Sequence, residues 1–216
     1  MDWTAQVDGY CERVGPGLWA EPVNAVTNLA FLFVAVLAWR AAREPGGWTL
    51  SAMLGVIGVA SGLFHTAATV ATGALDSLSI AVFAFTYLWL ATGDFLGLHG
   101  KLRAGVFAGF VLLLVAAVRY AVITAPVLGE NAAYLGIWAL ILGWGLGLRG
   151  MGLAAGRGLL IAAVILGLSI LLRALDGRLC GSLSIGTHWL WHLLNAAALW
   201  WMIEVRRRHL GGAARA

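Results

Sequence analysis

Long apolar runs separated by short polar segments extend through the whole chain. Each run is roughly 14 to 21 residues long, and about 20 residues are needed for a helix to cross a bilayer. Seven such runs are found, near Pro22–Trp39, Trp48–Ala67, Asp76–Leu96, Ala104–Val118, Ala132–Leu148, Leu159–Leu172 and Thr187–Ile203. The pattern predicts seven transmembrane helices.

The composition also indicates a membrane protein. Of the 216 residues, 61% are hydrophobic and only 11% are charged, which is more apolar surface than a soluble domain of this length can bury. We therefore predict an all-α integral membrane protein and, because no long linker interrupts it, a single domain over 1–216. Residues 1–21 form an acidic N-terminal segment without the apolar core of a signal peptide, and residues 205–216 form a basic tail.

Basic residues are divided unevenly between the two predicted sides of the membrane. The loops after the first, third and fifth runs, together with the tail, hold ten of the fourteen Lys and Arg residues. These ten are Arg40, Arg43, Lys101, Arg103, Arg149, Arg157, Arg206, Arg207, Arg208 and Arg215. The positive-inside rule then predicts a cytoplasmic C-terminus and an N-terminus outside. Because the net charge of +4 comes from short loops, it gives no reason to expect a nucleic-acid partner.

Three histidines and one aspartate lie in or beside the apolar runs. His188 and His192 are four residues apart, so on a helix both imidazoles share one face, as a chelating pair needs. The predicted topology puts His65, Asp76 and His188 at the outer ends of their helices. Ionisable groups in a membrane are costly and usually mark function, and three histidines with a water form a common catalytic zinc shell. We therefore expect a metal site at the three histidines; the alternative is separate interfacial polar residues, each bonded to a neighbour.

These residues form a recognisable combination of motifs. Ser61-x-x-x-His65 is followed by Asp76, eleven residues after the histidine, and His188-x-x-x-His192 opens the last run. In order and hydropathy, over most of its length, the chain resembles the alkaline ceramidases. These are seven-helix membrane amidases in a wider group that includes the adiponectin receptors.

The resemblance implies zinc-dependent hydrolysis of the amide bond of ceramide or a related N-acyl lipid. His65, His188 and His192 would bind zinc with a water. Asp76 would be the general base, and Ser61 would assist at the water or at the substrate oxygen. The chemistry fits, because zinc polarises an amide carbonyl and activates water, while a carboxylate can carry the water's proton to the leaving amine. A site in the outer leaflet suits a lipid whose acyl tails lie between helices.

The acidic N-terminal segment matches the family with two departures, one residue more between Asp8 and Cys11 and Val14 in place of an asparagine. The stretch Glu21-Pro22-Val23-Asn24-x-x-x-Asn28 fits the family pattern, and the resemblance implies a calcium site at Asp8, Glu12 and Glu21 beside the zinc. Several carboxylates in a short segment also suit a hard cation. The eukaryotic members favour Asp-Trp-Cys-Glu-x-Asn, whereas this chain reads Asp8-Gly9-Tyr10-Cys11-Glu12-Arg13 and has Val14 at the expected Asn position. A solvated acidic segment is the alternative.

The chain has two cysteines, Cys11 and Cys180. The predicted topology places both on the outer side, where an oxidising compartment lets a disulfide persist. The related eukaryotic enzymes have cysteines at what look like matching places, so we expect a disulfide between the two. The alternative is two thiols near the membrane interface.

Other functions fit parts of the pattern. The main alternative is a seven-helix receptor or sensor with a structural zinc site. Asp76 distinguishes the two functions, because an enzyme needs a base beside the zinc and a structural site does not. A metal transporter would need polar residues that continue inward, whereas the inner halves of the runs are largely apolar. The compact chain, rich in Ala, Gly, Leu and Arg, is typical of bacterial proteins. We therefore expect the protein to lie in the bacterial inner membrane with its site toward the periplasm. The expected partner is a membrane lipid, and an N-acyl lipid other than ceramide is an alternative substrate.

Overall fold

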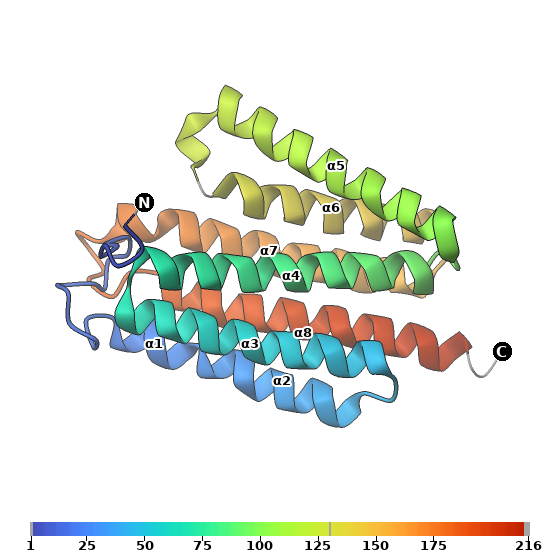
Figure 1. Ribbon diagram of the computed structural model, residues 1–216, viewed down its shortest axis with the longest axis horizontal. Helices are drawn as coiled ribbons and strands as arrows, with labels where there is room; N and C mark the ends of the chain where they lie inside the picture. Colours follow the sequence, from blue (N-terminus) through green and yellow to red (C-terminus); the bar gives the residue numbers. More distant parts are fainter. Residues whose placement is uncertain (1, 130, 214–216) are drawn as a thin grey trace.

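The computed structural model describes residues 2–129 and 131–213, and its regular structure is helical (Figure 1). Two elements are short, the helix α1 (Pro22–Thr27) and the 3-10 helix η1 (Pro126–Leu128). The long helices are α2 (Leu29–Ala41), α3 (Pro45–Ala67), α4 (Val70–Asp94), α5 (Gly100–Thr124), α6 (Asn131–Gly150), α7 (Ala154–Leu179) and α8 (His188–Ala213). They lie roughly along the long axis of the molecule as a bundle.

The helices cover the predicted runs, and six of the helical segments are long and apolar enough to cross a membrane. These are Pro22–Ala41, which combines α1 and α2, and the helices α3, α4, α5, α6 and α7. This indicates an integral membrane protein. The last helix, α8, has 26 residues, but its histidines, Glu204 and its arginines make it less apolar than the other six.

Helix boundaries differ from the apolar runs, and one predicted start is wrong. Helices α5 and α7 extend beyond their runs at both ends, to 25 and 26 residues. Helix α4 begins at Val70 rather than at Asp76, because Thr69 and Thr72 form a capping box that satisfies the first backbone N–H groups. Local capping rather than hydropathy sets this start, and Asp76 therefore lies within the first two turns of the helix.

Helix α8 lies at the centre of the bundle. It packs against α7 and α2 and also contacts α1, α3 and α4. The hydrophobic core around it includes Phe31, Leu54, Phe83 and Leu199. By contrast, no residue of α5 is buried, and this helix lies at the outside of the bundle against α4 and α6. The helix that carries two of the three expected metal ligands is therefore enclosed on several sides.

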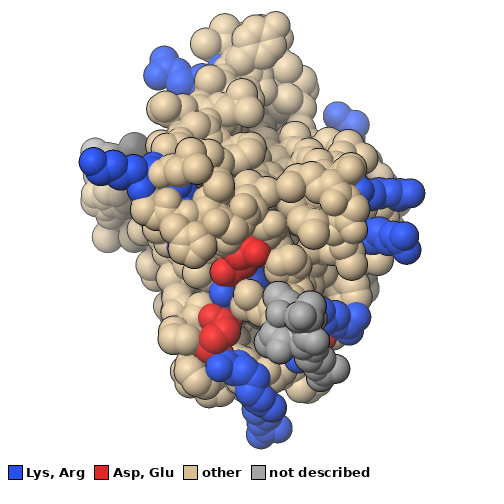
Figure 2. Space-filling model, turned by 90° about the vertical axis from the view of Figure 1, so that its right-hand side faces the viewer, with Lys and Arg blue, Asp and Glu red and all other residues tan. Residues whose placement is uncertain are grey.

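The bundle has two chemically different ends. At one end, which we call the histidine end, α3 finishes, α4 and α8 begin, and the N-terminal segment lies over them (left in Figure 1). The opposite end carries Lys and Arg side chains around its rim (Figure 2). There the buried guanidinium of Arg206 on α8 donates hydrogen bonds to Glu44 and Asp94, each at 2.6 Å. These two ion pairs hold α8 to the start of α3 and the end of α4.

A disulfide joins the N-terminal segment to the histidine end. It links Cys11 to Cys180, which follows α7, across a sequence separation of 169, and it is the pairing expected from the sequence. Asp176 in the last turns of α7 supports the same junction. Its carboxylate accepts hydrogen bonds from the backbone N–H groups of Cys11 at 3.0 Å and Thr187 at 2.6 Å. The segment before α8 and the start of the chain are thus held together.

Replacing both cysteines with serine should lower the melting temperature of the protein in detergent. The chain-entropy model gives about 5 kcal/mol for a loop of this length, and this is an upper bound because a membrane protein's unfolded state is already restricted. The measurement compares the Cys11→Ser/Cys180→Ser protein with the wild type. Thiol labelling of denatured, unreduced wild type should detect no free thiol, and two labelled thiols per chain before reduction would contradict the bond.

Candidate metal centre

Three histidine side chains meet at the histidine end of the bundle. His65 lies in the last turn of α3, and His188 and His192 lie in the first two turns of α8. All three are no more than 2% exposed, and each offers a ring nitrogen that lies within 4.8 Å of the others. The rings of His65 and His188 have centroids 4.6 and 4.7 Å from the ring of His192. Three ligand atoms at these separations could hold one metal ion.

Hydrogen bonds on the outer side of two rings set their orientation. Nδ1 of His65 lies 2.6 Å from a carboxylate oxygen of Glu21. Nδ1 of His192 lies 2.9 Å from the hydroxyl of Thr27, and this hydroxyl donates to the backbone carbonyl of Val23 at 2.8 Å. Because the carboxylate and the hydroxyl both act as acceptors, both rings carry a proton on Nδ1, and the neutral form of each ring then has its lone pair on Nε2.

The two Nε2 atoms face each other at the centre. They lie 3.0 Å apart, and in the neutral rings two lone pairs at this distance repel each other unless a shared proton or a metal ion lies beside them. The third ring adds an unsatisfied atom, because Nδ1 of His188 is buried and has no hydrogen-bond partner in the described part of the chain. Buried polar atoms are normally paired. The donor set therefore fits a metal ion, and histidines held by outer hydrogen-bond partners are common zinc ligands.

Glu21 is held as a carboxylate behind His65. Burial raises the pKa of Glu21, but hydrogen bonds from His65, Arg13 and Asn24 outweigh burial, so the net pKa lies below its usual value. These bonds measure 2.6, 2.5 and 3.1 Å. An ionised Glu21 accepts the Nδ1–H of His65 and raises the basicity of the Nε2 atom that faces the centre.

Asp76 and Ser61 lie beside the histidines. Ser61 is one turn before His65 on α3 and is buried. The carboxylate of Asp76 on α4 interacts electrostatically with His65 and Arg173 and is within hydrogen-bonding range of Ser61. Its Oδ1 atom is buried and, among residues 2–129 and 131–213, has no hydrogen-bond partner. This oxygen is therefore free to accept a proton or a hydrogen bond from a molecule in the site.

Several residues at the site were not expected from the sequence. Thr27 orients His192, as described above, and Tyr10 stacks on His188 with ring centroids 3.7 Å apart. Asp176 accepts a hydrogen bond from the backbone N–H of His188 at 2.9 Å and so fixes the start of α8. For Asp176 the sequence did offer a signal, because a carboxylate near the end of an apolar run is unusual and often has a specific partner. Tyr10 and Thr27 had no such signal, because their partners are distant in sequence.

The acidic residues of the N-terminal segment do not fit the calcium site that the resemblance implied. Both carboxylate oxygens of Glu12 accept backbone N–H groups, from Val23 at 2.7 Å and from Asn24 at 2.8 Å. Glu21 is bound by the three side chains given above. Asp8 is exposed. In the described part of the chain the carboxylate oxygens of Asp8, Glu12 and Glu21 do not all lie within 4.8 Å of one another, as the ligand atoms of a shared ion would. The buried carboxylates therefore already have protein donors in place of a cation.

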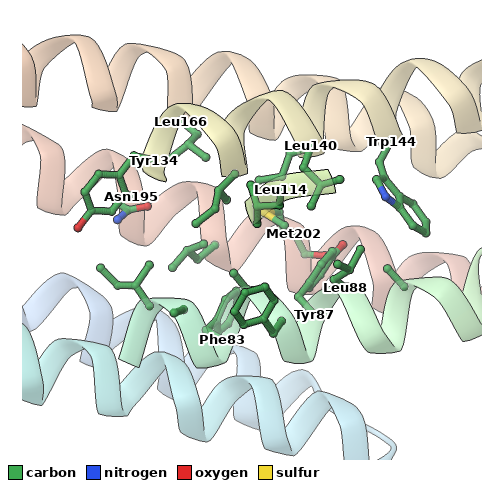
Figure 3. A pocket seen from close by; sticks show the side chains of 18 of the residues that line it. Phe83, Tyr87, Leu88, Leu114, Tyr134, Leu140, Trp144, Leu166, Asn195 and Met202 are labelled. Atoms are coloured by element: carbon green, nitrogen blue, oxygen red, sulfur yellow. The ribbon is translucent and has the colours of Figure 1, made fainter. Parts of the chain in front are cut away.

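An apolar cavity is lined mainly by α4, α6 and α8, with single side chains from α5 and α7, and follows the bundle away from the histidine end (Figure 3). Its lining on α8 consists of Trp191, Asn195, Leu199 and Met202, which continue the helix face that begins with His188. At 1.5 Å per residue this stripe is about 16 Å long. Tyr134 and Asn195 lie near one end of the cavity and Trp144 near the other. The cavity is therefore an elongated apolar space, and its Asn195 end lies toward the histidines on α8.

Comparisons with known proteins do not assign the chain to a family. No protein-family model matches the chain, and a search of curated proteins finds no match. The assignment of a function therefore rests on the chemistry of the site and on its motifs.

Proposed function

We propose that this protein is a zinc-dependent amidase that hydrolyses the amide bond of ceramide or a related N-acyl lipid. The observation that carries the proposal is the meeting of three buried histidines with Asp76, next to an elongated apolar cavity. The motifs shared with the alkaline ceramidases support the same activity.

Each residue of the site has a role in this reaction. The three histidines would hold a zinc ion, which supplies the Lewis acidity that polarises an amide carbonyl and acidifies water. Asp76 accepts the proton of the attacking water through its unpartnered Oδ1 atom and transfers the proton to the leaving amine. Ser61, one turn before His65, donates a hydrogen bond to the oxygen on which negative charge develops.

The cavity supports a lipid as the substrate. Its walls are formed largely by Leu, Ile, Ala and aromatic side chains from α4, α6 and α8, so an acyl chain would be buried there without loss of hydrogen bonds. Asn195 lies one turn after Trp191 and His192 on α8, and its carboxamide provides a polar contact between the histidines and the apolar part of the cavity. This order of polar and apolar walls matches the order of groups in an N-acyl lipid.

A membrane topology follows from the same proposal. Helix α8 crosses the membrane as the seventh span, and its polar residues are enclosed by the other helices. The basic end faces the cytoplasm by the positive-inside rule, so the histidine end faces outward. In a bacterial inner membrane the site would open toward the periplasm, an oxidising compartment that suits the disulfide at this end.

A receptor or sensor with a structural zinc site is the alternative. Structural zinc sites are almost always closed by four protein ligands, whereas catalytic sites keep one position for water. The group in the described part of the chain has three ligands, and the free Oδ1 atom of Asp76 lies beside it. Both observations favour the enzyme.

Lipid mass spectrometry of the purified, zinc-loaded protein tests the proposal. The protein is incubated with a panel of ceramides, N-acyl ethanolamines and N-acyl amino acids. We expect release of fatty acid and amine from at least one class, loss of this release after zinc chelation, and its return when zinc is added. Intact lipids across the whole panel would contradict the proposed activity.

A substitution in the cavity should shift the preferred acyl-chain length. Ala84 lines the cavity, so Ala84→Phe should shorten the chain that the cavity accepts and lower kcat/KM for long-chain substrates. Ala108→Phe is the matched control, because Ala108 is exposed on α5 and receives the same added volume. An unchanged chain-length profile in Ala84→Phe would exclude this cavity as the acyl-chain site.

A further inference from the structure

A buried arginine lies directly behind the metal centre. Arg13 is 7% exposed, and its guanidinium donates three hydrogen bonds. The acceptors are Oε1 of Glu21 at 2.5 Å and the backbone carbonyls of Gly15 at 2.9 Å and His65 at 3.4 Å. One carboxylate oxygen and two backbone carbonyl oxygens are the ligand types that a calcium ion uses in proteins.

We propose that Arg13 is a built-in cation that positions His65 through Glu21, in place of the calcium ion that the family resemblance implies, so that the metal centre works without calcium. This inference rests on the metal centre proposed above. Arg13 does not face the three histidine nitrogens, so it is a positioning residue and not a ligand.

The place that the guanidinium occupies suits a positive charge. The carbonyl of His65 lies in the last turn of α3, where carbonyl groups lack partners within the helix. The dipole of the helix also favours a cation at this end. The Glu21 carboxylate adds a full negative charge at 2.5 Å. A cation is therefore stabilised here from three directions, and Arg13 provides it from within the chain.

The arginine reaches the metal centre through two hydrogen bonds in series. Arg13 holds Oε1 of Glu21, and Nδ1 of His65 binds Oε2 of the same carboxylate. Without the guanidinium, a buried carboxylate oxygen would lose its partner, which is costly. Glu21 would then turn toward another donor, and the His65 ring would lose the orientation that directs its Nε2 atom at the centre.

The remaining acidic segment is consistent with a protein that needs no calcium. Glu12 uses both carboxylate oxygens on the backbone N–H groups that open α1. Val14 stands where the related enzymes have an asparagine; it is 89% exposed and has no side-chain oxygen. Val14, which lacks the side-chain oxygen of the expected calcium ligand, is therefore adjacent in sequence to Arg13, which supplies the positive charge.

Zinc affinity with and without calcium tests the inference. It is measured by competition with a chromophoric chelator for the full-length wild type and for Arg13→Gln. Wild type should bind zinc equally well without calcium and with about 10 mM calcium, above the roughly 10⁻⁴–10⁻³ M dissociation constants of weak extracellular calcium sites. Arg13→Gln should bind zinc more weakly without calcium, by up to about 10–100-fold, the usual effect of losing an outer partner of a ligand, because Glu21 would no longer hold the His65 ring.

Calcium should restore most of the affinity that Arg13→Gln loses. In this variant the oxygens of Glu21, Gly15 and His65 no longer have their cation, and calcium can bind them with added waters. Arg178→Gln is the matched control, because Arg178 is exposed on α7 near the same end. The control should keep wild-type zinc affinity, with no effect of calcium.

The outcomes separate this inference from the proposed metal centre. A wild type that binds no zinc would remove the metal centre and this inference together. A wild type that binds zinc, with Arg13→Gln binding it equally well, would overturn this inference alone. Calcium-dependent zinc affinity in the wild type would also overturn it, and this measurement decides even if Arg13→Gln does not fold.

Discussion

Replacing His188 or His192 with alanine is expected to abolish tight zinc binding. In the proposed metal centre each side chain would supply one of three ligands, so either substitution would leave two. Loss of an outer partner alone weakens metal binding about 10–100-fold, and loss of a ligand should therefore weaken it by more than about 100-fold. Both side chains are at most 2% exposed, so no mobile surface group replaces the lost ligand. Metal analysis of the purified proteins measures the effect.

A histidine outside the centre provides the control for this experiment. His99 precedes α5 and is exposed, so His99→Ala should keep the zinc content of the wild type. Circular dichroism should show unchanged helical content in all three variants. Stoichiometric zinc in both His188→Ala and His192→Ala would refute the assignment of the ligands.

Replacing Asp76 with asparagine is expected to leave zinc bound but to remove most of the hydrolysis. The amide has nearly the same size as the carboxylate and cannot act as a base at neutral pH. General acid–base catalysis contributes about 10²–10⁴-fold, so kcat for the best lipid of the panel should fall by about this factor. Zinc content should stay at the wild-type level because Asp76 is not one of the three proposed ligands.

Ser61→Ala should reduce kcat less than Asp76→Asn does. The zinc ion would still stabilise the oxygen that becomes negative, so the hydroxyl contributes only one hydrogen bond of this stabilisation. Ser77→Ala is the control, since Ser77 is exposed on α4, next to Asp76. Near-normal turnover in a folded, zinc-loaded Asp76→Asn protein would exclude Asp76 as the base and favour a structural zinc site.

Hydropathy and helical spacing were sufficient to predict the helices and to predict that the three histidines meet at one end of the bundle. A helix in a membrane must satisfy its backbone within itself, so each apolar run becomes a helix regardless of its neighbours. The four-residue spacing of His188 and His192 places both rings on one face. The parity of the helices then brings the end of α3 and the start of α8 to one end of the bundle. The start of α4 was missed, because the capping box at Thr69 and Thr72, and not the hydropathy, sets it.

The second layer of the site could not be read from local patterns, because it consists of contacts between distant segments. Glu21 and His65 are 44 residues apart, and Thr27 and His192 are 165 apart. The same carboxylate that suggests a calcium ligand in the sequence is bound in the fold by a histidine, an arginine and an asparagine. Which partner a buried charge receives depends on which segments the packed helices bring beside it. In this protein the packing brings Arg13 to Glu21 at the end of α3, where a cation is stabilised both by the carboxylate and by the unpaired carbonyls of the helix.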